Sequence, residues 1–144
     1  MTQENILDTF RETFRLNELT ISQSEHWVLS VRPEQLTLGS MVLSSSKGKT
    51  ELSQLTAEEG AALVQMLSKA ETLAKDKFGA VRINAICLMM KDPVVHFHIL
   101  PRYDKDIEFG GVVWHDKDYP KPPSIRPVQT EKNIVERLLS KLRD

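Results

Sequence analysis

The chain has 144 residues, a length that fits one domain, and its 40% hydrophobic and 27% charged residues are ordinary for a globular protein with a buried core. A formal net charge of −1 excludes broad electrostatic binding to nucleic acid or to an anionic membrane surface, although a local phosphate site needs only a few donors. No apolar run approaches the roughly 18–20 residues that span a bilayer.

The first third of the chain predicts a helix followed by three strands. Ile6, Phe10 and Phe14 recur at helical spacing, which is typical of a short amphipathic helix. The apolar segments that follow are short and separated by polar or breaking residues, and Pro33 ends the second of them. We therefore expect a helix at about residues 3–15 and strands at 19–22, 26–31 and 40–44.

A long helix comes next, and its ends are marked in the sequence. Thr56 and Glu59 form the T-x-x-E pattern of a capping box, and Gly79 is a stop signal. Between them one apolar face repeats at helical spacing, which predicts a helix over about 57–77. The members of that face are Ala62, Leu63, Met66, Leu67, Ala70, Leu73 and Ala74.

The rest of the chain predicts two strands and a last helix. Apolar segments favour strands over 81–89 and 94–100, residues 104–123 are loop-rich, and Thr130 is placed to cap a final helix. The inward face of that helix is expected to contain Ile134, Val135, Leu138, Leu139 and Leu142. This order of elements is typical of an α+β fold, and we expect a mostly antiparallel sheet of about five strands with the long helix across one face.

Two features favour a cytoplasmic protein. The single cysteine, Cys87, cannot form an internal disulfide, and its apolar surroundings favour a buried structural thiol in a reducing compartment. Residues 1–14 alternate polar and apolar side chains and carry acidic residues early, so they lack the apolar region of a secretory signal.

Residues 92–103 carry the most informative side chains. Because side chains alternate along a strand, His96 and His98 share one face, while Phe97 and Ile99 point the other way into apolar packing. A neutral imidazole is a nucleophile at near-neutral pH, and its attack on phosphorus gives a labile phosphoramidate. A second imidazole two residues on can donate to a phosphate oxygen, so the pair fits phosphoryl or nucleotidyl transfer.

Two plainer interpretations of the pair stay open. An H-x-H sequence also fits two ordinary histidines with no ligand. A metal site would need two further ligands. His26, Asp92, His115 and Asp116 are available, but none has tight ligand spacing.

The flanking residues favour the phosphate chemistry. The sequence VHFHILPR, residues 95–102, resembles the motif of the histidine-triad (HIT) family, His-φ-His-φ-His-φ-φ with φ apolar, which Pro-Arg frequently follows. Anchoring the resemblance on the Leu-Pro-Arg ending puts His98 at the third histidine and His96 at the central, catalytic one. The first histidine is replaced by Val94.

The resemblance covers about residues 20–105. Arg32 and the segment LGSMVL at 38–43 are similar to the start of a strand in the family, with Ser40 where histidine is usual. The LTAEE opening of the long helix also matches, as does Asn84 on the strand before the motif.

The resemblance implies a nucleotide-binding α+β domain over residues 1–144, with a loop-rich tail and terminal helix at 104–144. Family members act at the α-phosphate of dinucleoside polyphosphates, adenosine phosphoramidates or nucleotide sugars, and their central histidine is transiently nucleotidylated. For this chain it implies a small nucleotide substrate, no cofactor, and a homodimer through the long helix and an adjoining strand edge. The version here looks closest to the diadenosine-polyphosphate hydrolases.

The departures from the family motif bear on the substrate. In the family the first histidine helps to set the protonation of the central histidine and of the leaving group, and Val94 can do neither. The usual Gly-Gln-rich phosphate loop is replaced by residues 89–93. A nucleoside polyphosphate needs little acid help to leave, whereas an amine needs more, so we expect polyphosphate rather than phosphoramidate substrates.

Several residues are candidates for contacts with the nucleotide. The resemblance and their chemistry indicate Arg32, Asn84 and His98 as ribose or phosphate contacts. Lys91 could reach a phosphate but is more simply a surface lysine, and Arg102 is expected to fix the end of its strand or the dimer edge rather than bind substrate.

The leading hypothesis is therefore a metal-independent nucleotide hydrolase with a covalent step on His96. The alternatives are a degenerate nucleotide-binding protein that has lost catalysis with its first histidine, and an H-x-H metal-binding protein. The presence of His96 favours the enzyme, because a protein that only binds has no need of the nucleophile.

Overall fold

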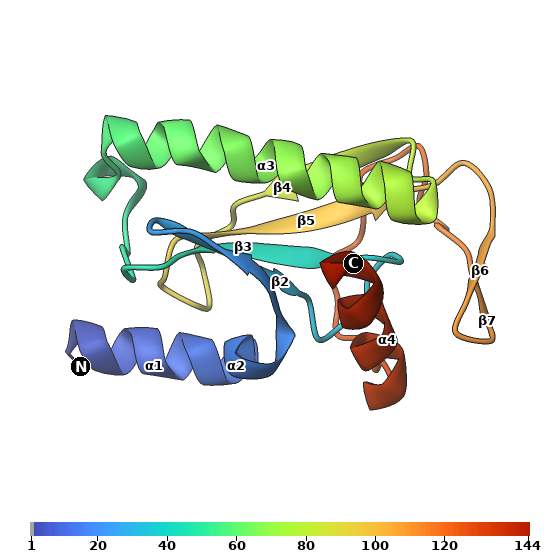
Figure 1. Ribbon diagram of the computed structural model, residues 1–144, viewed down its shortest axis with the longest axis horizontal. Helices are drawn as coiled ribbons and strands as arrows, with labels where there is room; N and C mark the ends of the chain where they lie inside the picture. Colours follow the sequence, from blue (N-terminus) through green and yellow to red (C-terminus); the bar gives the residue numbers. More distant parts are fainter. Residues whose placement is uncertain (1) are drawn as a thin grey trace.

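The computed structural model describes residues 2–144 and shows an α+β fold built on one five-stranded sheet (Figure 1). The strand order is β1-β2-β3-β5-β4, and every neighbouring pair is antiparallel. The predicted fold class, the number of strands and their antiparallel pairing are confirmed. The strands are β1 (Thr20–Gln23), β2 (Trp27–Val31), β3 (Met41–Ser45), β4 (Arg82–Ile86) and β5 (His96–Arg102).

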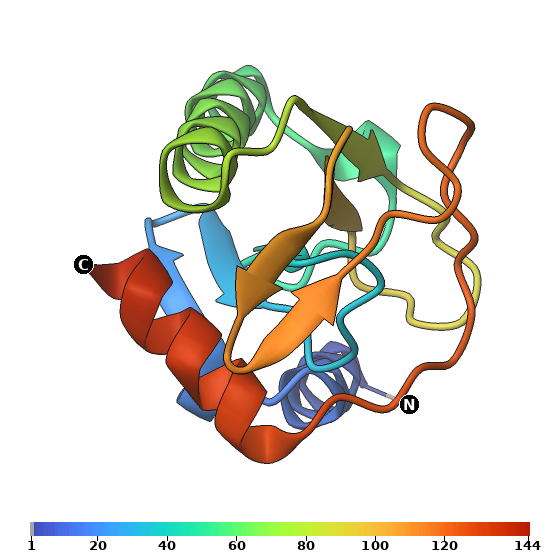
Figure 2. The ribbon, with the colours of Figure 1, turned by 90° about the vertical axis from the view of Figure 1, so that its right-hand side faces the viewer.

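Helices pack against both faces of the sheet. In Figure 1 the long helix α3 runs above the sheet and α1 runs below it, while Figure 2 shows α4 lying across the end of the molecule. No helix within residues 2–144 is long and apolar enough to cross a membrane. The helices are α1 (Gln3–Thr13), α2 (Leu16–Leu19), α3 (Ala57–Phe78) and α4 (Lys132–Arg143), with a short 3-10 turn η1 (Leu52–Gln54).

The ends of α3 are set by the residues that the sequence marks. The Thr56 hydroxyl accepts a hydrogen bond from the Glu59 N–H at 3.1 Å, and the Glu59 carboxylate accepts one from the Thr56 N–H at 3.0 Å. Gly79 follows the last turn with φ +75°, a left-handed conformation that glycine adopts without strain. The predicted capping box and stop signal are both confirmed.

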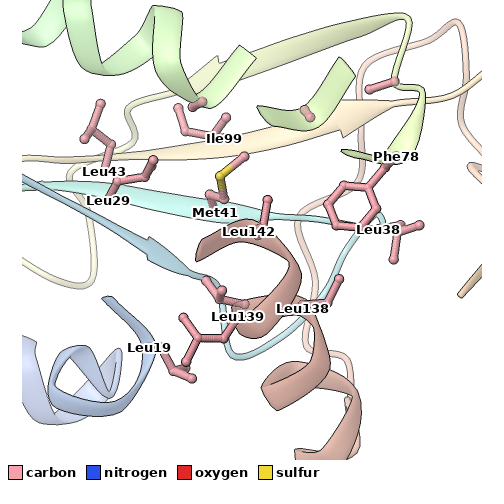
Figure 3. Close-up of a cluster of buried hydrophobic side chains, with 14 of the residues drawn as sticks. Leu19, Leu29, Leu38, Met41, Leu43, Phe78, Ile99, Leu138, Leu139 and Leu142 are labelled. Carbon is pink, nitrogen blue, oxygen red and sulfur yellow. The ribbon is translucent and has the colours of Figure 1, made fainter. Parts of the chain in front are cut away.

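The main core lies between the sheet and the helices α3 and α4 (Figure 3). All five apolar residues expected on the inward face of the last helix are buried there. Trp27 is fully buried beneath α3, and its indole N–H donates to the Glu59 carbonyl at 2.9 Å. The strands contribute alternate residues to this core, including Leu29, Met41, Leu43 and Ile99, and Val95 just before β5 belongs to it as well.

A second apolar cluster fills the opposite face of the sheet. Phe10 of α1 and Phe14, the C-cap residue of that helix, pack there against strand residues and against Val94. Their helical spacing puts both rings on the side of α1 that faces the sheet. The N-terminal helix therefore covers the sheet face on which the two histidines lie. The buried members of the cluster are Phe10, Phe14, Leu16, Val28, Val42 and Val94.

Strand β5 is longer at its end than the sequence predicts. It continues through Pro101 to Arg102, although the predicted strand ended at residue 100, just before this proline. Pairing with β3 stops at Ile99, whereas pairing with β4 continues beyond that point. Beyond Ile99 the strand therefore has a neighbour on one side only, and proline is tolerated at such an edge. By contrast β4 ends early, before the loop in which Met89 has φ +55°.

Other differences arise in turns and caps. The region expected to be loop-rich contains a hairpin of β6 (Ile107–Phe109) and β7 (Val112–Trp114), joined by Gly110 and Gly111, both with positive φ. A Gly-Gly pair between apolar residues is a sequence signal of such a hairpin, so the prediction of a loop here was wrong. Thr130 does not cap α4, because its hydroxyl accepts from the Gln35 N–H at 2.9 Å.

A buried ion pair ties the end of β5 to the segment after β7. The Arg102 guanidinium donates to both Asp116 carboxylate oxygens, at 2.7 and 3.1 Å, and to the Asn84 side-chain oxygen at 2.7 Å. Burial raises the pKa of the Asp116 carboxyl, but hydrogen bonds from Arg102 and from the Tyr103 N–H outweigh it and leave that pKa below its usual value. Arg102 thus fixes the end of its strand.

We predict that Arg102→Met destabilises the fold by about 3–5 kcal/mol, because it leaves the Asp116 charge buried without its partner. Urea unfolding measures this change in the free energy of unfolding. The matched control is Arg82→Met, at an exposed position on β4. A double variant, Arg102→Met with Asp116→Leu, should recover most of the loss because it removes both charges. Equal losses for the Arg102 and Arg82 variants would contradict the importance of the pair.

Candidate active site

The two histidines lie side by side on the face of β5 that α1 covers. Their ring centroids are 4.9 Å apart and the rings are nearly perpendicular. His96 is 3% exposed and His98 is 7% exposed, so both imidazoles are largely removed from water. The residues that alternate with them, Val95, Phe97 and Ile99, contribute to the main core on the other face.

His96 is held in one tautomer by the backbone. Its Nδ1 lies 2.6 Å from the carbonyl oxygen of Val94. Because a carbonyl oxygen only accepts, Nδ1 carries the proton, and the neutral ring therefore has its lone pair on Nε2. An imidazole with a free Nε2 lone pair is the form that attacks an electrophile.

His98 is held in the opposite tautomer by Arg32. The Arg32 Nε donates to His98 Nδ1 at 3.3 Å, so the ring proton of neutral His98 is on Nε2. Burial, the Arg32 charge and the neighbouring His96 together lower the pKa of His98 to about 4. At neutral pH His98 is thus a neutral imidazole whose Nε2–H can donate.

Arg32 is itself fixed by the loop after β2. Its Nη1 donates to the Glu34 carbonyl at 2.7 Å. Burial lowers the pKa of the guanidinium, and Glu34 opposes this, but an arginine stays charged in proteins. The sequence predicts a contact of Arg32 with ribose or phosphate, and the structure places the positive charge of Arg32 beside His98.

A pocket of about 270 Å³ opens onto both imidazoles. The end of α1, the loop after β2 and the loop from β4 to β5 form its walls. Charged side chains of both signs and apolar side chains line it together, so it can accept a ligand with polar and apolar parts. The lining residues outside β5 are Thr13, Phe14, Arg32, Pro33, Glu34, Leu88, Met89, Met90, Lys91, Asp92 and Ile125.

The cover that α1 provides was not foreseen from the sequence. The ring of Phe10 lies 5.2 Å from that of His96, and the ring of Phe14 lies 5.7 Å from His96 and 6.4 Å from His98, between centroids. The helical spacing of these phenylalanines predicts an amphipathic helix, but no local pattern indicates which face of the sheet it covers.

Val94 is fully buried beneath this helix. Its side chain belongs to the apolar cluster beneath α1, and its backbone carbonyl accepts the hydrogen bond from His96 Nδ1. A histidine side chain here would be removed from water among apolar groups, where an imidazole without a hydrogen-bond partner costs about 1–3 kcal/mol.

Asn84 and Lys91 occupy different places. Lys91 lines the pocket with the histidines, whereas Asn84 does not. Asn84 instead accepts a hydrogen bond from Arg102 and lines a larger pocket, of about 530 Å³, beside β4, which contains neither histidine. A contact of Asn84 with nucleotide stays a prediction.

Of the residues weighed as extra metal ligands, Asp92 lines the pocket with the two histidines, whereas His115 and Asp116 have partners elsewhere. His115 Nδ1 lies within hydrogen-bond distance of the Asp106 carboxylate, near the exposed hairpin, and the Asp116 carboxylate accepts a hydrogen bond from Arg102. Within residues 2–144 no group of three or more His, Cys, Asp or Glu side chains is placed to hold a metal ion.

Comparison with known proteins by sequence finds no matching family model and no matching curated protein. Comparison of structures gives full-length similarity. A HIT-like protein involved in cell-cycle regulation from Bartonella henselae has a TM-score of 0.69 at 18% identity, covering 94% of this chain and 93% of that one. This chain has the histidine-triad fold.

Two further solved structures share that fold. A histidine-triad protein from Sinorhizobium meliloti has a TM-score of 0.70 at 15% identity, with 91% of each chain covered. A zinc-bound histidine-triad family protein from Mycobacterium smegmatis has a TM-score of 0.61 at 14% identity, covering 93% of this chain and 94% of that one.

We predict that His98 stays neutral down to about pH 4. The unfolded chain takes up this proton near pH 6.5, so the contribution of His98 to stability is complete above that pH. It decreases as the pH falls toward 4, by up to about 3 kcal/mol at about 1.4 kcal/mol per pKa unit. Nuclear magnetic resonance (NMR) titration measures the pKa, and urea unfolding at pH 7 and pH 5 measures the stability.

The control is His98→Asn, which should lose less stability than the wild type between these pH values. His115→Asn, on the exposed hairpin, should behave as the wild type does. Arg32→Met should raise the pKa of His98 only in part, because burial is the larger cause. A wild-type His98 that titrates near pH 6.5 would contradict the assignment.

Proposed function

We propose that the protein hydrolyses a nucleotide at its α-phosphate through a nucleotidyl intermediate on His96. The observation that carries this proposal is the opposite tautomers of the two imidazoles. The Val94 carbonyl leaves Nε2 of His96 as a nucleophile, and Arg32 leaves Nε2–H of His98 as a donor. Both rings line one pocket. The histidine-triad fold of the solved structures supports the same chemistry.

The first step forms a bond from His96 Nε2 to the α-phosphorus and breaks the bond from that phosphorus to the oxygen of the leaving group. The leaving group departs as an anion, and the His96 ring becomes cationic while its Nδ1–H still donates to the Val94 carbonyl. The neutral His98 donates from Nε2 to a non-bridging oxygen of the phosphate, where negative charge must be stabilised.

The second step releases the nucleotide. A water oxygen bonds to phosphorus, the bond from phosphorus to His96 Nε2 breaks, and the proton of the water passes to solvent. The Val94 carbonyl is then in place to hold the same tautomer for the next cycle. No step requires a metal ion, and the charge beside the phosphate comes from Arg32.

The substrate class follows from the leaving group. The apolar side chain of Val94 is buried where the family motif has its first histidine, so it cannot protonate a departing amine. A nucleoside polyphosphate leaves as a stable anion and needs no such help. We therefore favour a dinucleoside polyphosphate, as in diadenosine-polyphosphate hydrolases, over a phosphoramidate.

Two other functions are outcomes of the same experiments. A degenerate protein would bind the nucleotide without turnover. A metal protein is the second alternative, because a zinc-bound protein of the same fold is known. Dialysis against a chelator, followed by unfolding and activity measurements, distinguishes this case, since a metal protein would lose stability or activity.

We predict that His96→Ala abolishes turnover but still binds nucleotide, because the covalent route is lost while the pocket remains. His98→Ala should turn over about 10²–10³-fold more slowly, since it loses one donor to the transition state. Chromatography of products from dinucleoside polyphosphates, adenosine phosphoramidate and nucleotide sugars measures the activity. His115→Ala, on the exposed hairpin, is the matched control.

The intermediate can be trapped directly. A substrate labelled at the α-phosphate and quenched rapidly without acid should leave label on the wild-type protein, in a bond that is acid-labile and base-stable. If no label appears and His96→Ala keeps wild-type turnover, the covalent mechanism is wrong. Binding without turnover would favour the degenerate protein.

A further inference from the structure

The carbonyl that holds His96 belongs to a peptide group whose C=O and N–H are both hydrogen-bonded. The oxygen of the peptide between Val94 and Val95 accepts from His96 Nδ1 at 2.6 Å. The N–H of the same peptide, on Val95, donates to the carbonyl of Lys49 at 2.7 Å. Because a peptide group is planar, fixing its N–H also fixes the direction of its oxygen. The backbone of Lys49 therefore sets the acceptor for the candidate nucleophile.

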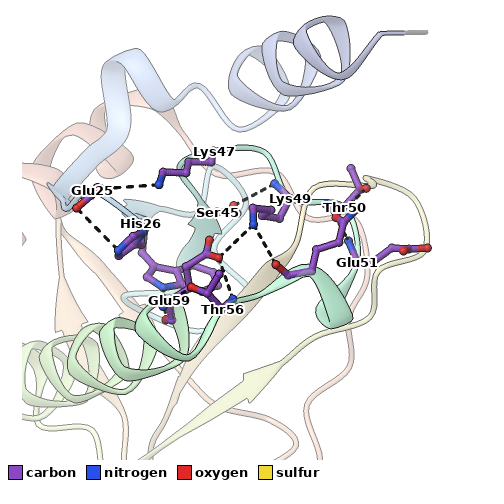
Figure 4. Close-up of polar contacts among 11 residues, drawn as sticks. Glu25, His26, Ser45, Lys47, Lys49, Thr50, Glu51, Thr56 and Glu59 are labelled. Atoms are coloured by element: carbon purple, nitrogen blue, oxygen red, sulfur yellow. Dashed lines mark hydrogen bonds and ion pairs between the residues drawn. The ribbon is translucent and has the colours of Figure 1, made fainter.

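Lys49 is held in place by its side chain as well as by its backbone (Figure 4). Its Nζ donates to the Glu59 carboxylate at 3.2 Å and to the Gln54 carbonyl at 2.9 Å. Its backbone N–H donates to the Ser45 hydroxyl at 3.1 Å. These bonds connect the loop after β3 to the turn η1 and to the first turn of α3.

Glu59 is a buried and fixed acceptor for the Lys49 side chain of this loop. Its side chain is buried, with 3% exposed, and the Thr56 N–H holds the same oxygen that Lys49 reaches. The hydrogen bond from Thr56, aided by Lys49, keeps the pKa of Glu59 below its ordinary value despite burial. The carboxylate is thus a charged acceptor fixed to the start of the longest helix.

We propose that Lys49 is a positioning residue for His96. Its ammonium, anchored on Glu59, holds the Lys49 carbonyl against the Val95 N–H, and this keeps the Val94 oxygen aimed at His96 Nδ1. The tautomer of a histidine is set by the hydrogen bond that its other nitrogen makes, so Lys49 determines that the Nε2 lone pair is free. The catalytic consequence rests on the proposed function, whereas the tautomer itself does not.

The experiment compares Lys49→Met with Lys47→Met, which removes an exposed lysine from the same loop. Nitrogen-15 NMR of the histidine rings measures the tautomers without any need for activity. The wild type and Lys47→Met should show His96 protonated on Nδ1 only. In Lys49→Met we expect a mixture of the two His96 tautomers, while His98 is unchanged because Arg32 holds it.

The kinetic readout follows from the tautomer. In Lys49→Met kcat should fall by about 10–100-fold, by analogy with the loss of groups that orient metal-binding histidines, while KM changes little. Lys49→Arg, which keeps a cation for Glu59, should restore the wild-type tautomer and most of kcat. If Lys49→Met does not fold, Lys49→Gln keeps a neutral donor and provides the same comparison.

The outcomes separate this inference from the proposed function. A folded Lys49→Met or Lys49→Gln protein whose His96 keeps the wild-type tautomer would overturn the positioning role. A shift of the tautomer in a protein whose wild type hydrolyses no nucleotide would support the positioning role and overturn the proposed function.

Discussion

The orientation of β5 is set by the packing of the apolar side chains that point away from the histidines. Phe97 and Ile99 contribute to the main core beneath α3, and β3 and β4 bond the strand on both sides. A shift of the register by one residue would put imidazoles into that core and Ile99 into the pocket. The burial of apolar side chains on one face therefore fixes the chemistry on the other.

The two imidazoles are buried side by side, and the hydrogen bonds at their Nδ1 atoms make them different. Two charged rings 4.9 Å apart beneath phenylalanine side chains would be strongly destabilised. Each Nδ1 has a partner of opposite kind, an acceptor for His96 and a donor for His98. The arrangement makes the two rings different, so that Nε2 of one can attack while Nε2–H of the other donates.

The polar groups around the site act through the backbone as much as through side chains. The Val94 carbonyl, the Lys49 carbonyl and the Glu59 carboxylate lie on three segments that are far apart in the sequence. Arg102 and Asp116 provide a similar connection at the other end of β5, where they hold the strand to the segment after the hairpin. In this way a single strand is fixed at both ends by buried polar contacts.

Much of the fold could be predicted because its signals are local. The capping box at Thr56, the stop at Gly79 and the apolar face of α4 depend on residues within a few positions of one another, and alternation along β5 puts His96 and His98 on one face. The resemblance to the histidine-triad motif then indicated the chemistry. Pro101 misled the prediction because its tolerance depends on where β3 ends.

The tertiary structure decided the features that join distant segments. The sequence does not reveal that Phe10 and Phe14 cover the histidines, that Arg32 sets the tautomer of His98, or that Asn84 faces a different pocket. The sequence by itself determined which side chains lie on each face of β5, since alternation is a local property of an extended chain. Their tautomers, cover and charge depend on contacts across the fold, because burial and hydrogen bonding exist only once the segments have packed together.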